Sequence, residues 1–343
     1  MITKKIIVKP KTSFISKFHS DTFFGEFCRY ASFMYGKDYL FEKIGLKNKK
    51  ANIAFSNPLP ENLFPIPKYW ITKVLESFNI ENENDYDYLK KFKKLKYISL
   101  DIFELLHEKF LKLSKLENQE EKNKSNEKKD LLEKISNILK KYIDTKKDES
   151  GVKTFSNLHV AIDRISFGAL EGALFEIEEY FFKADKLIIF FKYDEKILKE
   201  EEIKEILHVF GEDGFGAKKS VGKGSFDFEI KDLKEIEKRY LVKDFKTERM
   251  GYITSLSVGF PLKEEIEENS KNYIETFTTF PKHGPDAYNS GIFKIPLIMS
   301  NIGSTFKIKE YTEIYGDLVK ISGKIENNDY KYRHSRLIVP IYV

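Results

Sequence analysis

The 343-residue chain is predicted to be an α+β protein with two ferredoxin-like domains in tandem and a helical insertion between them. Its elements fit the order strand–helix–strand–strand–helix–strand in both halves, more loosely in the first, and this order defines the ferredoxin-like arrangement. Helical and highly charged segments fill the middle of the chain, and strand patterns dominate after them. We therefore expect domains at residues 1–112 and 151–343, with the charged helical insertion at residues 113–150.

The N-terminal segment is expected to form a strand and then a helix. Residues 3–9 alternate weakly and are rich in β-branched side chains, which indicates a strand. Ser20, Asp21 and Thr22 are favourable helix N-cap residue types. A buried helix face follows, because apolar residues recur at spacings of three and four, at Phe23, Phe27, Tyr30 and Met34. A second strand is expected at residues 51–56.

The region from residue 58 to residue 151 is predicted to be a rigid loop followed by helices. Four prolines between positions 58 and 67 predict the loop. Helical periodicity extends over residues 86–116 and again over residues 131–143. The charged segment 118–130 lacks apolar residues, which is typical of a solvated loop or helix extension. The polar residues 144–151 are expected to be a linker.

Strands dominate the rest of the chain. Residues 186–193 predict a buried strand, because five consecutive apolar residues lie between Lys186 and Lys192, and a helix is expected at residues 195–210. Further strand patterns lie at residues 158–163, 172–182, 226–230, 251–258, 273–280, 294–299, 317–322 and 336–343.

Composition excludes several classes of protein. Hydrophobic residues make up 41% of the chain and charged residues 33%, as in globular soluble proteins. No apolar run reaches the roughly 18 residues that a membrane-spanning helix needs, and the N-terminus is too interrupted for a signal peptide. The single cysteine, Cys28, excludes an intrachain disulfide framework and a cysteine-rich zinc site. We therefore expect a cytoplasmic protein with no membrane association. The net charge of +5 is modest, so a nucleic-acid surface would be a local patch.

The most informative feature is a glycine-rich loop at residues 211–225, which contains five glycines and three lysines. Glycine lets the backbone approach a ligand closely, and exposed backbone N–H groups beside lysines suit phosphate. The spacing matches neither a P-loop nor a dinucleotide-binding loop. A basic glycine loop of another kind favours a polymeric phosphate backbone, whereas the alternative is a flexible surface connector.

Other candidate residues each allow more than one interpretation. His19, at the helix entrance, could serve as an acid or base, hydrogen-bond RNA, or simply pack there. Arg164 could clamp a phosphate or pair with Asp163. Phe215 and Phe226 could stack on bases or anchor the loop to the core. The six histidines are scattered without metal-ligand spacing, so we expect neither a metal nor another cofactor.

Several segments in order resemble the RAMP superfamily, and most closely the subunit of the type III-A (Csm) CRISPR effector complex that caps the 5′ end of the guide. Each motif is weak alone, but their joint order is specific and spans most of the chain. The matching segments are HSDTFFGEFCRY at residues 19–30, YG at 35–36, FPIPK at 64–68, KYISL at 96–100, IDRI at 162–165, EGALF at 171–175, GEDGFGAKKSVGKG at 211–224 and YGDL at 315–318.

The resemblance implies two ferredoxin-like (RRM-like) domains and a non-catalytic subunit that holds the 5′ repeat-derived tag of the crRNA. Its implied partners are the large polymerase-like subunit and a backbone RAMP subunit. Residues 156–175 would form a thumb-like segment that displaces a nucleotide from the guide duplex, with Arg164 at its base. The implied RNA-binding residues are His19, Ser20, Asp21, Thr22, Arg164, Gly214, Phe215, Gly216, Lys218, Lys219, Ser220, Gly222, Lys223 and Gly224.

Two other functions stay open on the sequence. One is a metal-independent CRISPR endoribonuclease of the same superfamily with His19 as acid or base, although no second catalytic group is spaced to assist it. The other is a protein-only scaffold in which the glycine-rich loop docks a neighbouring subunit.

Overall fold

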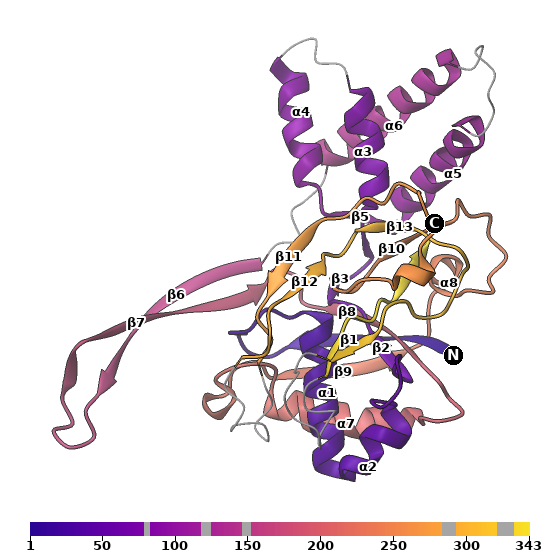
Figure 1. The fold of residues 1–343 in the computed structure, drawn as a ribbon. Coiled ribbons are helices and arrows are strands. Elements are labelled where there is room, and N and C mark those ends of the chain that lie inside the picture. The colour runs from indigo at the N-terminus through magenta and orange to yellow at the C-terminus, as the bar shows by residue number, and fades with distance from the viewer. Residues whose placement is uncertain (79–82, 118–124, 146–151, 283–292, 321–332) are drawn as a thin grey trace.

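The computed structural model describes residues 1–78, 83–117, 125–145, 152–282, 293–320 and 333–343. Figure 1 shows a body built on antiparallel sheets, a helical unit at one end of it, and a long hairpin that projects to one side. The predicted α+β class is confirmed.

The first sheet of the body has the strand order β2–β8–β1–β9 with antiparallel neighbours, and the short β3 also pairs with β8. Along the chain its elements follow the order β1, α1, β2, β8, α7, β9, which is the ferredoxin-like order. Their bounds are β1 (Ile2–Pro10), α1 (Ser20–Tyr35), β2 (Ile53–Phe55), β3 (Leu59–Pro60), β8 (Leu187–Tyr193), α7 (Glu200–Asp213) and β9 (Phe226–Lys231).

This sheet shows that the predicted domain boundaries at residues 112 and 151 are wrong. Strand β1 pairs with both β8 and β9, so that Ile6 lies opposite Ile189 on one side and Ile230 on the other. Both predicted domains therefore contribute to one sheet. Residues 56–186, which include the short β3, lie between β2 and β8 along the chain. Ile6 is fully buried because β1 is a central strand.

Helices α1 and α7 pack beside each other on the same face of the first sheet (Figure 1). The predicted helix face is confirmed, since Phe23 and Phe27 are fully buried. The ring of Phe23 lies 5.0 Å from that of Phe210 in α7, measured between centroids. Helix α1 ends at Gly36, whose φ of +83° favours glycine. Two short helical segments follow it, α2 (Lys37–Tyr39) and the π-helix η1 (Leu40–Ile44).

The helical unit is larger than the insertion predicted at residues 113–150. Helix α6 packs against α3, α4 and α5, so the unit extends over residues 68–145. Trp70 of α3 stacks on Phe110 of α5 with ring centroids 5.0 Å apart, and both are fully buried. The bounds are α3 (Lys68–Ser77), α4 (Glu83–Lys94), α5 (Leu100–Glu117) and α6 (Ser125–Thr145).

The proline-rich segment was predicted to be a loop, but it contains short strands. Pro60 ends β3, and Pro65 ends β4 (Leu63–Pro65), which pairs with β5 (Tyr97–Ser99) at the base of the helical unit. Proline is tolerated in such short, peripheral strands because it removes few ladder hydrogen bonds there.

The projecting hairpin consists of β6 (Val152–Ile162) and β7 (Ala169–Phe182) (Figure 1). It is exposed along most of its length, although many of its side chains are apolar. The exposed apolar residues are Val152, Phe155, Leu158, Val160, Ile162, Ile165, Phe167, Leu170, Leu174, Phe175 and Phe181. The thumb-like segment predicted at residues 156–175 is the distal part of this hairpin.

The rest of the body contains a second antiparallel sheet in the order β13–β10–β16, with a separate small hydrophobic core that includes Ile253, Phe306 and Tyr342. Strand pairs β11–β12 and β14–β15 flank it. The predicted strand at residues 317–322 is β14 up to residue 320, and the remainder lies outside the described residues. The bounds are α8 (Glu235–Leu241), β10 (Tyr252–Ser255), η4 (Lys263–Glu265), β11 (Thr276–Thr279), β12 (Leu297–Ser300), β13 (Thr305–Lys307), β14 (Leu318–Lys320), β15 (Arg333–Ser335) and β16 (Pro340–Tyr342).

A buried lysine connects the two sheets. Lys192 of β8 is fully buried and donates from Nζ to the Leu241 carbonyl at 2.7 Å and to Glu313 at 2.6 Å. It also lies 3.2 Å from the hydroxyl of Tyr342 in β16. These bonds satisfy a cation that would otherwise be costly to bury, and they fix the relative position of the sheets.

Candidate nucleic-acid interface

The segment between β1 and α1, residues 11–19, holds the glycine-rich loop in place. The Gly224 N–H donates to the Ser13 carbonyl at 2.8 Å, and the Ala217 N–H donates to Ser16 Oγ at 3.1 Å. The same segment leads directly into α1. Two regions predicted from distant parts of the sequence, the glycine-rich loop and the α1 entrance, therefore adjoin in the fold.

The glycines of the loop mainly serve its shape. A Cβ on Gly224, whose φ is +78°, would lie 2.2 Å from the Phe215 carbonyl oxygen. A Cβ on Gly214 would lie 2.5 Å from the Lys223 carbonyl oxygen, and one on Gly216 would lie 2.6 Å from Ser16 Cβ. These three glycines allow the two sides of the loop to pack against each other and against the segment of residues 11–19.

The exposed end of the loop is the part that a ligand can reach. It consists of Ala217 to Gly222 around the 3₁₀ turn η3 (Lys219–Val221). Gly222 has a φ of +79° and open space around it. Lys218 also has a positive φ, of +62°, and is exposed, as is Ser220. An exposed turn of this shape, next to a lysine, is suited to an anion.

Phe215 is not available to stack on a base, although it was predicted to contact RNA. It is fully buried, and its ring stacks on that of Phe18 at a centroid distance of 4.3 Å. Phe226 is also buried. The interpretation of both as anchors of the loop is correct, because they join an aromatic cluster with Phe14 and Phe182 beneath the site.

The three lysines of the loop have different surroundings. Lys219 pairs with Glu26 of α1 at 2.7 Å and lies over the Tyr30 ring. Lys223 pairs with Glu179 of β7 at 2.7 Å and with Ser13 Oγ at 3.0 Å. Among the described residues, no carboxylate lies within ion-pair distance of Lys218. Lys218 is therefore the lysine of the loop whose charge is most available to a phosphate.

The ion pair of Lys223 ties the loop to the projecting hairpin. Glu179 also accepts a hydrogen bond from Ser13 Oγ at 2.5 Å, and the Lys223 ammonium is the main reason that the pKa of Glu179 is lowered. Phe14 and Tyr180 exchange two backbone hydrogen bonds, at 3.0 and 2.7 Å. The base of the hairpin, the loop and the segment before α1 are thus one connected region.

The α1 entrance contains two residues that are buried rather than free for RNA. The Ser20 N–H donates to Asn57 Oδ1 at 2.9 Å, and Ser20 Oγ accepts from the Val258 N–H at 3.0 Å. Asp21 is buried, with its Oδ2 3.0 Å from His334 Nε2. Both residues therefore connect α1 to the second half of the body.

His19 and Thr22 are the accessible members of this group. His19 is the N-cap residue of α1, half-buried, with its ring 5.5 Å from that of Phe277 in β11 between centroids. Burial lowers the pKa of His19, while the Asp21 charge opposes this shift. The neutral imidazole therefore dominates at neutral pH. Thr22 is exposed.

Arg164 lies in the turn at the tip of the hairpin, not at its base as predicted. The Asp163 carboxylate accepts from the Ile165 N–H at 2.8 Å and from Ser166 Oγ at 3.1 Å, which shapes the turn. Within the described part of the chain, no carboxylate forms an ion pair with the exposed Arg164. The glycine-rich loop contacts the other end of the hairpin, at Glu179, so Arg164 does not belong to the same site.

Sequence reasoning missed Ser13, Ser16 and His334, which hold the site residues in place. Serines before a helix carry no distinctive pattern, and His334 is separated from Asp21 by most of the chain. The exposure of the hairpin could not be recognised, because residues 158–163 alternate in the way that is typical of a half-buried strand.

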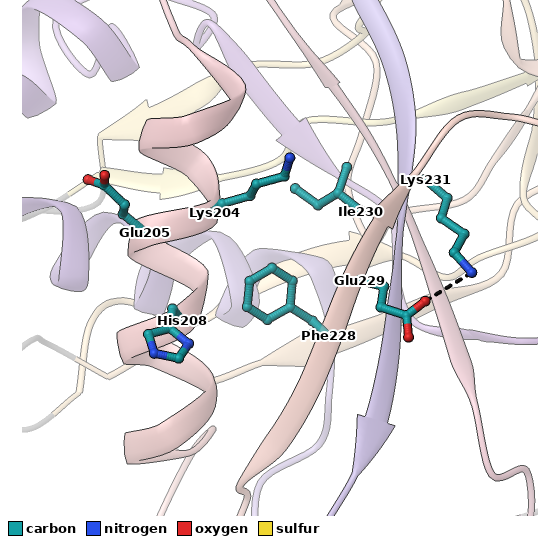
Figure 2. Close-up of a pocket in the computed structure, with 7 residues that line it drawn as sticks. All are labelled: Lys204, Glu205, His208, Phe228, Glu229, Ile230 and Lys231. Carbon is teal, nitrogen blue, oxygen red and sulfur yellow. Dashed lines mark ion pairs between the residues drawn. The ribbon is translucent and has the colours of Figure 1, made fainter.

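A surface cavity of about 550 Å³ lies elsewhere, between α7 and β9. Figure 2 shows Lys204, Glu205 and His208 on the helix side and Phe228 to Lys231 on the strand side. This cavity contains none of the residues predicted to bind RNA.

Across the described ranges, no group of histidine, cysteine and carboxylate side chains is arranged to hold a metal. No helix in the described part of the chain is long and apolar enough to cross a membrane.

Residues 68–227 match the family model of the RAMP superfamily. This match confirms the resemblance to that superfamily drawn from the sequence motifs. No curated protein matches the chain.

Solved structures that include Csm4 share the fold over the full length of the chain. A Csm3-Csm4 subcomplex of the type III-A CRISPR-Cas interference complex matches with 19% identity and a TM-score of 0.56, covering 98% of this chain and 99% of that chain. A Csm1-Csm4 cassette in complex with cA4 matches with 14% identity and a TM-score of 0.56, covering 100% of this chain and 98% of that chain. The Csm1-Csm4 cassette in complex with pppApA matches with 15% identity and a TM-score of 0.54, covering 99% of this chain and 98% of that chain. This chain therefore has the fold found in these Csm4-containing structures.

Proposed function

We propose that this chain is a non-catalytic RNA-binding subunit of a type III-A CRISPR interference complex and that it holds the 5′ repeat-derived tag of the crRNA. The observation that carries this proposal is the juxtaposition of the glycine-rich loop with the α1 entrance, in a chain with the fold of Csm4-containing structures. Tag nucleotides are single-stranded, and single strands are bound through phosphates and unstacked bases.

Two groups at this junction would contact the tag. Lys218 and the exposed turn around it would bind phosphates, because the Lys218 ammonium has no carboxylate within ion-pair distance among the described residues. His19 and Thr22 would contact a further phosphate or a base edge at the positive end of α1, which is 16 residues long. The remaining predicted residues would act by shaping or anchoring these elements.

The chain would also dock the large polymerase-like subunit onto the backbone. The solved structures that share its fold pair Csm4 with Csm1 in one case and with Csm3 in another. The exposed apolar side chains of the β6–β7 hairpin support a role in assembly, because soluble proteins rarely expose so large an apolar surface without a partner.

An endoribonuclease that uses His19 is the competing function. Its neutral imidazole could accept a proton, but the nearby Asp21 is buried against His334 and is not free to assist. Incubation with repeat RNA in EDTA distinguishes the two functions. Cleavage that His19→Ala abolishes would favour the enzyme, whereas intact RNA that remains bound supports the subunit.

The decisive experiment is purification of the chain from its host, followed by sequencing of the bound RNA and identification of the bound proteins. Short RNAs with one shared 5′ repeat-derived tag, together with a large polymerase-like subunit, are expected. Unprocessed repeat transcripts without partners would contradict the proposal in favour of the endoribonuclease. Co-purified subunits that stay assembled in high salt without any RNA would favour a protein-only scaffold.

A further inference from the structure

The end of α4 and the turn after it carry an exposed cluster of lysines. Lys90, Lys91, Lys93, Lys94 and Lys96, called here the α4 lysine cluster, are all exposed. Throughout the described ranges, no carboxylate lies within ion-pair distance of any of them. By contrast, many other surface lysines of this chain are paired, as Lys134 is with Asp130 at 2.6 Å.

The arrangement of α4 gathers these charges on one surface. Phe92 is fully buried against the helical unit. At 100° per residue, the four lysines of the helix cover the arc opposite Phe92. Lys90 lies 4.3 Å from the ring centroid of Tyr86, which is 51% exposed. Asp87 is exposed on the same side of the helix and offsets one charge, so the cluster keeps a clear positive excess.

The cluster is connected to the α1 entrance along strand β11. Lys96 lies within electrostatic range of Glu275, whose carboxylate already pairs with Lys68. Phe277 follows two residues later, about 7 Å along an extended chain, and its ring contacts that of His19. In Figure 1, β11 extends from the base of the helical unit toward α1.

We propose that the α4 lysine cluster binds the phosphodiester backbone of RNA beyond the nucleotides held at the glycine-rich loop and the α1 entrance. This inference rests on the proposed function, that is, on RNA bound at that junction. Lysines are compact charges on flexible stems, so they suit backbone contacts that do not depend on base sequence. The cluster would lengthen the RNA track along β11 and give the helical unit a role in RNA retention.

The test compares two variants with the same change in charge within the same helical unit. The test variant is Lys90→Glu, Lys93→Glu and Lys94→Glu. The control variant is Lys112→Glu, Lys129→Glu and Lys141→Glu, because these lysines of α5 and α6 are exposed and have no carboxylate within ion-pair distance in the described part of the chain. Affinity is measured for the full chain with single-stranded RNAs of about 4 to 24 nucleotides at several salt concentrations, and thermal melting checks that both variants fold.

The wild-type chain is expected to bind long RNA more tightly than short RNA. The test variant should lose that gain, about tenfold or more, and the salt slope for long RNA should fall by about two, at roughly 0.7 per phosphate contact. Its binding to the shortest RNAs should change little. The control variant should retain the dependence on RNA length.

Three outcomes would overturn the inference. Equal losses in both variants would show a general effect of net charge. An unchanged length dependence in the test variant would remove the cluster from the RNA surface while leaving tag binding intact. Loss of subunit assembly with RNA binding unchanged would identify the cluster as a protein-docking surface. If the wild-type chain binds no RNA of any length, the proposed function itself fails, and this result is distinct from the other three.

Discussion

Two lysines in the glycine-rich loop illustrate how surroundings decide what a charged residue can do. Lys223 pairs with Glu179, whose side chain is only 8% exposed, and with Ser13. Lys218, five residues earlier, is exposed in a left-handed conformation. A paired lysine must break its ion pair before it can bind a phosphate, whereas a free lysine only releases counterions. The two residues are therefore expected to differ in RNA binding.

Lys218→Ala should weaken RNA binding a few-fold and reduce the salt slope by about 0.7, as expected for one lost phosphate contact on a single strand. Lys219→Ala is the control, because Glu26 already neutralises that lysine. Binding titrations at several salt concentrations would measure both slopes. Equal effects of the two substitutions would contradict the assignment of Lys218.

A second comparison concerns Gly224 and Gly222, which both have positive φ. Gly222→Ala should cost about 1–2 kcal/mol, the penalty for an L-residue in the left-handed region. Gly224→Ala should cost about 1–3 kcal/mol more, because its Cβ would lie 2.2 Å from the Phe215 carbonyl and force the loop apart. Urea denaturation of both variants measures the difference. Similar costs would mean that the loop opens without strain.

The buried contact between Asp21 and His334 gives a pH dependence. Burial alone would raise the pKa of Asp21, but the hydrogen bond from His334 holds it below the ordinary value of 3.8. A lowered folded-state pKa stabilises the fold above the unfolded value, and this contribution disappears as pH falls through the folded value. Asp21→Asn should therefore be less stable than wild type at pH 7, and the difference should shrink below about pH 4.

Thermal melting of both proteins between pH 7 and pH 3 is the measurement for Asp21. The His334→Leu variant should also lose stability at neutral pH, because leucine has no hydrogen-bond donor for Asp21. A difference in melting temperature between Asp21→Asn and wild type that stays constant at all pH values would refute a charge-dependent contribution.

The β6–β7 hairpin shows how an element can fold without being buried. Its two strands pair with each other over most of their length, from Val152 opposite Phe182 to Ile162 opposite Ala169. Its base contacts the body through Glu179, Tyr180 and Phe182. The apolar side chains beyond the base therefore contribute little to the stability of the isolated chain, and they are better explained by a partner.

Replacement of residues 157–177 by Asn-Gly tests this view, because that dipeptide closes a two-residue hairpin between Ser156 and Glu178. The truncated chain should melt within a few degrees of wild type and aggregate less, since the exposed apolar surface is gone. Assembly with partner subunits should be lost. A large drop in melting temperature would show that the distal hairpin stabilises the fold after all.

At the scale of the whole molecule, chain connectivity and folding units do not coincide. The central strand β1 lies between β8 and β9, which are more than 170 residues away in sequence. The insertion between β2 and β8 carries the helical unit and the hairpin. A fragment that ends near residue 112 therefore lacks both neighbours of its own central strand.

We expect residues 1–112 to remain unfolded when they are expressed alone. Residues 151–343 should also remain unfolded, because they lack β1. Mixing the two fragments should restore part of the structure only if the missing strands pair in trans. Circular dichroism and NMR dispersion would report this. A folded, cooperative 1–112 fragment would contradict the single-sheet arrangement.

The sequence alone was sufficient to predict the α+β class, most strands and helix α1. These features depend on local periodicity, as in the spacing of Phe23, Phe27 and Tyr30. Local periodicity is determined by residues that lie close together in the sequence. Motif order was likewise enough to indicate a resemblance to the RAMP superfamily, whose family model matches residues 68–227. The glycine-rich loop was recognisable for the same reason, since its composition is unusual within a short window.

Only the tertiary structure decided which of the candidate residues are free to bind. Ser20, Asp21 and Phe215 are buried and Lys223 is paired, because residues far along the chain, such as His334 and Glu179, come to lie against them. The domain boundaries failed for the same reason, since β1 pairs with strands from the other half. Long-range pairing depends on the register and packing of the whole chain, and no single window of sequence contains that information.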